Sequence, residues 1–183
     1  MGGYLWIIAF LAVVAPLLTL IHELGHAGAA LALVPQHDVT IRIGRDPKIS
    51  LYKRGRLHIL VHPLGGCEGH YGWGAARVEV ATSSAIWIAL AGPLASLVMA
   101  LVCAGLKNAL GEGPSLARTL VNASMYYNML QFAATIIPVK YPTWWFGYAG
   151  RWSDGLLAWH CLFGEGDKVV LTDTARRDEI VND

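Results

Sequence analysis

The chain alternates long apolar stretches with shorter polar ones. Residues 1–36 contain a single charged side chain, Glu23, and residues 81–106 and 119–139 contain none. Each stretch is longer than the ~20 residues that a helix needs to cross the hydrocarbon core of a bilayer. The pattern therefore predicts three transmembrane helices, at about 3–34, 81–106 and 119–139.

Shorter elements are expected between and after these helices. Residues 39–43 and 57–61 are rich in strand-forming residues and are separated by turn sequences, which predicts a small β-hairpin or sheet over about 37–66. Residues 155–164 are too few to cross a bilayer and are expected to pack beside the helices. Residues 164–183 are polar and lack apolar periodicity, as in a surface tail.

These elements predict an all-α membrane protein. Three transmembrane helices would carry a small cytosolic β-hairpin or sheet, in one domain over residues 1–163 that ends in a polar tail. The composition agrees, because 55% of the residues are hydrophobic and 15% are charged. The net charge of +1 gives no indication of nucleic-acid binding. The first stretch lacks the basic start of a signal peptide, so we expect it to be retained.

The basic residues predict an orientation. Residues 37–80 hold seven Lys and Arg side chains, whereas residues 107–118 hold two. Basic loops stay in the cytosol, which places the N-terminus outside and opens the site described next toward the cytosol. Together with the small size of the chain, this suggests an integral protein of a prokaryotic inner membrane.

The candidate chemistry lies in the first apolar stretch, where residues 22–26 read HELGH. His22 and His26 are four residues apart, so they project from one face of a helix and can share one Zn²⁺. Glu23 can take a proton from a metal-bound water. An ionisable group in hydrocarbon costs at least ~2.5 kcal/mol, and a bound metal offsets that cost. HExxH also occurs by chance in soluble helices.

A catalytic zinc needs three protein ligands and one open position, so a third ligand must come from elsewhere in the chain. The candidates are Asp154, His62, His70, His160 and Cys161. Asp154 is preferred, because it follows the third predicted span and precedes a short apolar segment that returns it to the bilayer edge near HELGH. Alternatively, Asp154 caps the N-terminus of a helix that begins at Gly155.

Four strings in this order resemble the site-two protease family of intramembrane zinc metallopeptidases. They are HELGH at 22–26, HPLGG at 62–66, AGPLAS at 91–96 and SDG at 153–155. The resemblance covers residues 18–157 and implies a zinc endopeptidase that cuts transmembrane segments of other membrane proteins. It also implies Asp154 as the third ligand and Gly65 and Gly66 as part of a strand near the substrate.

The chain departs from this family in two places. Residues 135–138 read TIIP where the family has Asn-x-x-Pro, so Thr135 or Asn128 would have to replace an asparagine that holds the substrate or the developing oxyanion. Asn128 could equally bond to a neighbouring helix. An aromatic insertion at 139–153 is either an interfacial belt or a lid over the metal, with the aromatic residues Tyr141, Trp144, Trp145, Phe146, Tyr148 and Trp152.

The expected reaction is hydrolysis of a peptide bond in a membrane-protein or peptide substrate. Because a helix hides its carbonyls, the substrate must unwind, and the strand at 57–64 is the expected template, through Leu57, Ile59 and Val61. One alternative is a non-proteolytic zinc-binding subunit or regulator of a membrane partner complex. Another is a lipid-binding scaffold without metal. Glu23 favours the protease, because a structural zinc has no use for a general base.

Overall fold

The computed structural model describes residues 2–63, 65–74, 77–113, 115–145, 147–164 and 167–172. One continuous helix opens the chain and comprises α1 (Gly2–Ala9), a π-helical turn η1 (Phe10–Val14) and α2 (Ala15–Leu33). The other helices are α3 (Thr82–Ala109), α4 (Leu116–Ile136) and α5 (Asp154–Phe163). The strands are β1 (Val39–Ile43), β2 (Ile49–Arg54), β3 (Leu57–Val61), β4 (Gly69–Trp73), β5 (Arg77–Ala81) and β6 (Lys168–Thr172).

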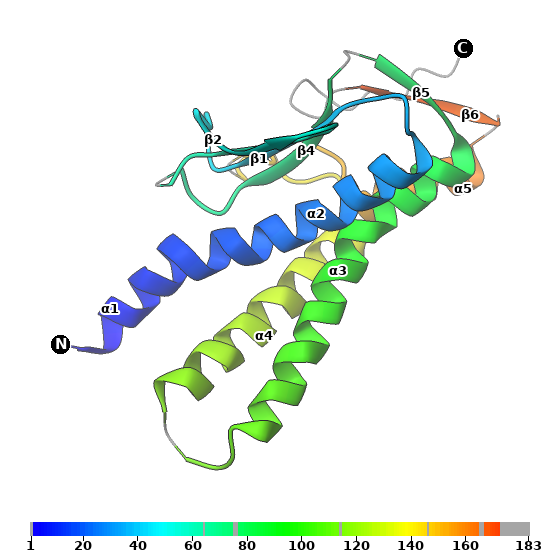
Figure 1. Ribbon diagram of the computed structural model, residues 1–183. Helices are drawn as coiled ribbons and strands as arrows, with labels where there is room; N and C mark the ends of the chain where they lie inside the picture. The colour runs from blue at the N-terminus through cyan, green and yellow to red at the C-terminus, as the bar shows by residue number, and fades with distance from the viewer. Residues whose placement is uncertain are drawn as a thin grey trace.

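The strands form two sheets. The larger sheet has the order β2-β3-β1-β4, in which β1 and β3 are parallel and the other neighbours are antiparallel. The smaller sheet pairs β5 with β6. In Figure 1 the larger sheet covers one side of α2, while α3 and α4 lie on the other side. The C-terminal half of α2 is therefore enclosed between strands and helices.

The main core holds the larger sheet against α2. Val39, Ile41 and Ile43 alternate inward along β1, as expected for a strand with one buried face. They pack in one cluster with Ala27 and Ala30 of α2, and with residues of α3 and of the β5–β6 sheet. This packing sets the distance between α2, β4 and the start of α3, where the functional residues lie.

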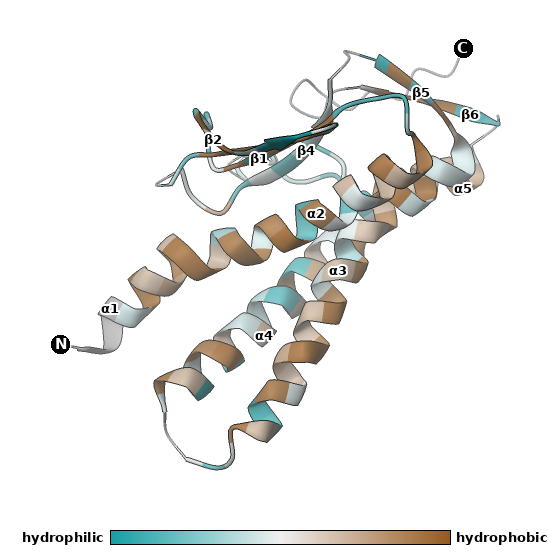
Figure 2. Ribbon diagram, in the orientation of Figure 1, coloured by the Kyte–Doolittle hydropathy of each residue, from teal (hydrophilic) through white to brown (hydrophobic). Residues whose placement is uncertain are grey.

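The predicted fold class is wrong, because the protein is mixed α/β and its described residues contain two candidate spans instead of three. In the described part of the chain, Trp6–Leu33 and Thr82–Ala109 are long and apolar enough to cross a membrane. The predicted span at 119–139 corresponds to α4, which is uncharged over that range but contains Asn122, Asn128 and Gln131. Figure 2 shows apolar residues along α2 and α3, and hydrophilic bands on α4.

The β-structure extends beyond the predicted segment at 37–66. That segment forms β1, β2 and β3, while β4 and β5 follow it. A further strand, β6, occupies 168–172 of the predicted polar tail, where Val169 and Leu171 face Val80 and Val78 of β5 and are buried. Cross-strand apolar pairs of this kind stabilise a two-stranded sheet. The remainder of that tail, residues 173–183, lies outside the described residues.

Candidate metal centre

Three predicted ligand atoms converge beside α2. The Nε2 atoms of His22 and His26 lie 3.2 Å apart, and Asp154 Oδ2 lies 3.4 Å from each of them. Both histidines are buried, with exposed fractions of 3% for His22 and 1% for His26. The helical spacing of four residues explains the histidine pair, and α5 brings the carboxylate from the far end of the chain. These residues form a group that could hold a metal ion.

The outer nitrogens of both histidines are held by α3. His26 Nδ1 lies 2.7 Å from the Ile88 carbonyl oxygen, and His22 Nδ1 lies 2.9 Å from Ser96 Oγ. Because a carbonyl oxygen only accepts hydrogen bonds, His26 carries a proton on Nδ1, and its Nε2 is the ring nitrogen that faces Asp154 and could bind a metal. Metal-binding histidines are commonly oriented by such second partners.

Two glycines allow the elements to approach this closely. A Cβ atom on Gly92 of α3 would overlap the His26 ring, so the AGPLAS string supplies the space that the ring occupies. A Cβ atom on Gly155 would overlap the Ile136 carbonyl at the end of α4. The glycine after Asp154 therefore lets α5 start against α4, with the carboxylate directed toward the histidines.

Asp154 does not cap α5. The cap is Ser153, whose side chain accepts a hydrogen bond from the Leu156 N–H, and Asp154 is the first helical residue. The carboxylate is thus available to the histidines, and its side chain is 22% exposed. Burial by itself raises the pKa of Asp154, but His26 and His22 more than offset this, so the pKa lies below its usual range. Asp154 is therefore anionic, as a metal ligand must be.

The spacing of the three atoms suits a tetrahedral ion. Zinc bonds of about 2.0–2.2 Å to nitrogen and oxygen place two ligands of a tetrahedron about 3.3–3.6 Å apart. The three observed separations, 3.2, 3.4 and 3.4 Å, lie in or close to that range. Two imidazoles and one carboxylate also form the donor set of many catalytic zinc sites. The donor types and their spacing are therefore those that a zinc ion requires.

Glu23 lies beside this group but is not one of its three members. The side chain is buried, and its carboxylate accepts a hydrogen bond from the backbone N–H of Tyr71 in β4. The same strand stacks the Tyr71 ring on His26, with centroids 4.7 Å apart. β4 therefore positions both the histidine and the predicted general base.

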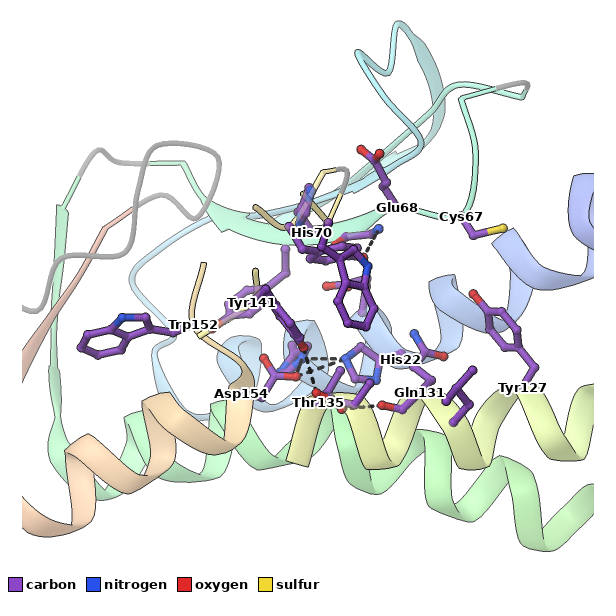
Figure 3. Close-up of a pocket in the computed structure, with 18 of the residues that line it drawn as sticks. His22, Cys67, Glu68, His70, Tyr127, Gln131, Thr135, Tyr141, Trp152 and Asp154 are labelled. Carbon is purple, nitrogen blue, oxygen red and sulfur yellow. Dashed lines mark hydrogen bonds and ion pairs between the residues drawn. The ribbon is translucent and has the colours of Figure 1, made fainter. Parts of the chain in front are cut away.

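A cavity of about 660 Å³ opens onto the metal centre. Glu23 and the three predicted ligands line one side, as Figure 3 shows for His22 and Asp154. Thr135 also lines it, although its hydroxyl donates to the Gln131 carbonyl of its own helix. Asn128 does not line the cavity: it is fully buried, and its amide donates to the Ser124 carbonyl. Thr135 therefore offers a hydroxyl already bonded to its own helix, and Asn128 does not place its amide beside the metal ligands.

The predicted substrate template is contradicted by the order of the strands. β3 lies between β2 and β1, so both of its edges are already paired and no further strand can be added to it. Leu57, Ile59 and Val61 of β3 are also absent from the cavity wall, as are Gly65 and Gly66. Gly65 instead packs against Gly44, in the turn after β1.

The other candidates for a third ligand have different surroundings. His160 stacks on Trp152, and Cys161 is part of the main core. His62 has a buried Nδ1 without a partner in the described structure, but it does not line the cavity. His70 does line the cavity, and its Nδ1 accepts a hydrogen bond from Arg151. Burial and the nearby Arg151 and Arg42 lower the pKa of His70 to about 3.

Several residues of the cavity were not predicted. Tyr127 and Gln131 line it from α4, and the Gln131 side-chain oxygen is buried without a partner in the described structure. Together with Thr135 these residues are spaced by four, which places them on one face of a helix. That spacing was the available signal, since a polar face on an uncharged helix indicates a cavity or a buried interface.

The aromatic insertion forms the opposite wall. Its described aromatic residues all line the cavity, namely Tyr141, Trp144, Trp145, Tyr148 and Trp152, while Phe146 lies outside the described residues. The insertion is a loop tied to the start of α5 by the Val139 carbonyl, which accepts from the Ser153 N–H. It therefore lies where a lid over the metal centre would lie.

Comparison of the chain with protein-family models, curated proteins and solved structures found no match. A proposal for its function therefore rests on the geometry of the metal centre and on the sequence strings that meet there.

Proposed function

We propose that this protein is a zinc-dependent intramembrane endopeptidase similar to the site-two proteases. The observation that carries the proposal is the meeting of HELGH and Asp154 at ligand spacing, with Glu23 beside them on the wall of a large cavity. Three ligands leave a fourth position for water, which is the arrangement of a catalytic zinc site.

Each residue has a defined part in the reaction. His22, His26 and Asp154 would hold the ion, and Ser96 and the Ile88 carbonyl keep the imidazoles in the orientation that binds it. Bound zinc would supply a Lewis acid and lower the pKa of a water toward ~7. Glu23 would take the proton of the attacking water and pass it to the leaving amine.

The membrane setting supports an intramembrane substrate. HELGH lies in Trp6–Leu33, one of two helices long and apolar enough to cross a membrane, and both histidines bond to the other, Thr82–Ala109. The site would therefore reach substrate segments within or beside a bilayer. The excess of basic residues in 37–80 favours an orientation with this segment in the cytosol, as in a prokaryotic inner-membrane protein.

A second candidate function is a zinc-binding subunit that regulates a membrane partner without cutting it. The surroundings of Thr135 and Asn128 favour it, because the Thr135 hydroxyl donates to a carbonyl of its own helix, and Asn128 is buried and does not line the cavity where an oxyanion would form. Glu23 favours the protease, because it lies beside the ligands without joining them.

Cleavage of single-span substrates in reconstituted vesicles tests the proposal. The zinc-loaded protein should release fragments from at least one member of a broad panel, and a chelator should abolish this activity until zinc is restored. The fragments are measured by gel electrophoresis and mass spectrometry. Full zinc occupancy without cleavage of any substrate would favour the regulatory subunit.

The proposed orientation predicts a labelling pattern in intact cells. A cysteine introduced at Lys53, in the basic segment, should resist a membrane-impermeant thiol reagent, whereas one at Glu112 should react. The parent chain, with its three native cysteines, gives the background. The reverse pattern would move the metal centre to the outer side of the membrane.

A further inference from the structure

β4 is an edge strand whose outer side faces the cavity. Within the larger sheet it pairs only with β1. Hydrogen bonds run from the Gly44 N–H to the Glu68 carbonyl and from the Gly74 N–H to the Asp38 carbonyl. They show which residues along β4 direct their backbone groups toward β1. In an antiparallel pair, the residues between such positions direct their N–H and C=O groups away from the partner. The groups of Gly69 and Tyr71 therefore point to the free edge.

Both free-edge groups of Gly69 are occupied by one side chain of the aromatic insertion. The Tyr148 hydroxyl accepts a hydrogen bond from the Gly69 N–H at 2.8 Å and donates one to the Gly69 carbonyl at 3.2 Å. A residue of an added antiparallel strand would make the same two bonds with its own carbonyl and N–H. The hydroxyl thus takes the place of one residue of an added strand at this edge.

The occupied position adjoins the metal centre. Two residues along the same edge, the Tyr71 N–H donates to Glu23, the proposed general base. Gly69 also lies against α2, since a Cβ atom on it would overlap Thr19 and meet the Glu23 carboxylate. A polypeptide segment that paired with Gly69 would therefore run directly past Glu23.

The loop is held on this edge by a small number of polar and close contacts. Arg151 donates to His70 Nδ1 at 3.0 Å, and the Tyr148 ring meets the His70 ring edge-on. Gly147 has a φ of +72°, and a Cβ atom there would overlap the Glu68 carboxylate. Burial keeps the pKa of Tyr148 well above its usual value, so the hydroxyl stays protonated and can donate.

We propose that Tyr148 is an internal competitor for the substrate, which occupies the free edge of β4 and must leave before an extended polypeptide segment can pair with Gly69. This inference rests on the proposed protease function, and it identifies both the strand that receives the substrate and the residue that limits access. The aromatic insertion then acts as a gate whose closed state is the one described. Its release exposes the edge that leads to Glu23.

Binding of an extended peptide tests the proposal without requiring cleavage. The experiment uses the full chain, zinc-loaded, with Glu23→Gln in every arm so that the peptide stays intact. A fluorescent peptide taken from a single-span substrate is titrated and its anisotropy is measured. Tyr148→Phe removes the hydroxyl and keeps the ring, so the dissociation constant should fall roughly 5-fold, as expected for the loss of hydrogen bonds that compete with binding. Tyr52→Phe, on the opposite edge strand, should leave it unchanged.

Hydrogen exchange at the Gly69 amide provides a second measurement. The amide should exchange slowly in the Glu23→Gln chain that retains Tyr148, and roughly 5-fold or more faster once Tyr148→Phe is added. Bound peptide should slow the exchange again. A peptide carrying N-methyl groups along its backbone should lose the gain in affinity, because it cannot pair with an edge.

The outcomes separate this proposal from the protease function. An unchanged or weaker affinity in Tyr148→Phe, or an unprotected Gly69 amide in the peptide complex, would overturn the role of Tyr148 even if the wild-type protein cuts its substrates. Tighter binding and a protected Gly69, combined with no cleavage by the zinc-loaded wild type, would support the gate and refute the protease.

Discussion

Purified protein should contain about one zinc per chain, and replacing any one of the three proposed ligands by alanine should reduce retained zinc to near zero after dialysis. The reason is geometric, because His22, His26 and Asp154 each supply one of three atoms that lie 3.2 to 3.4 Å apart. Two remaining ligands cannot hold the ion against competition from water. Zinc is measured by atomic emission and expressed per chain.

His160→Ala is the matched control for this experiment. His160 lies on α5 with Asp154, but it stacks on Trp152 outside the group of ligands, so the variant should keep its zinc. Ser96→Ala should give an intermediate result, with zinc affinity lowered roughly 10- to 100-fold, because Ser96 only orients His22. Wild-type zinc content in a variant lacking both His22 and His26 would refute the assignment.

The local part of the site could be predicted from sequence because helix periodicity determines it. A spacing of four residues places His22 and His26 on one face, whatever packs around them. Asp154 is far away in sequence, and helix periodicity could not place it. The sequence favours it because of its position between the predicted third span and a short apolar segment, and because of a resemblance to a known family. The structure supplies the missing physical reason in two glycines. Gly92 lets α3 approach the His26 ring, and Gly155 lets α5 begin against the end of α4.

Strand order and the third span could not be predicted in the same way. Alternation identifies strands such as β1 and β3, but it does not show that they pair in parallel or that β4 takes the edge beside the metal. The stretch at 119–139 is uncharged, yet charge alone does not measure the cost of burying polar groups in lipid. The amides on α4 carry that cost, and one of them, Gln131, lines the cavity instead.

The contact between Tyr148 and Gly69 lies beyond sequence analysis for a different reason. An aromatic cluster in a loop has no periodicity, so its side chains cannot be assigned to a surface from their spacing. The hydroxyl reaches β4 only because the insertion folds back from α5, and because Gly147 permits contact with Glu68. A lid could be suggested from the glycines and aromatic residues, but its closed position required the structure.

Glu23→Gln should abolish cleavage while leaving zinc and fold intact, with a fall in kcat of roughly 10²–10⁴-fold. Glutamine retains the volume of the side chain, and its amide oxygen can still accept the hydrogen bond from Tyr71 N–H. It cannot accept a proton from the attacking water, so the chemical step is lost. Substrate binding should persist, and the variant should trap intact substrate in the membrane. Zinc content, circular dichroism and cleavage are measured on the same preparation.

Glu79→Gln is the control for removal of a carboxylate. Glu79 lies on β5, is exposed and pairs with Lys168, far in the sequence from the HELGH string, so this variant should cut at the wild-type rate. If Glu23→Gln also cuts at that rate, Glu23 is not the general base and the proposed mechanism fails. If Glu23→Gln instead loses zinc, Glu23 supports the ion directly, and the loss of cleavage would follow from the empty site. Only inactivity with full zinc assigns Glu23 to proton transfer.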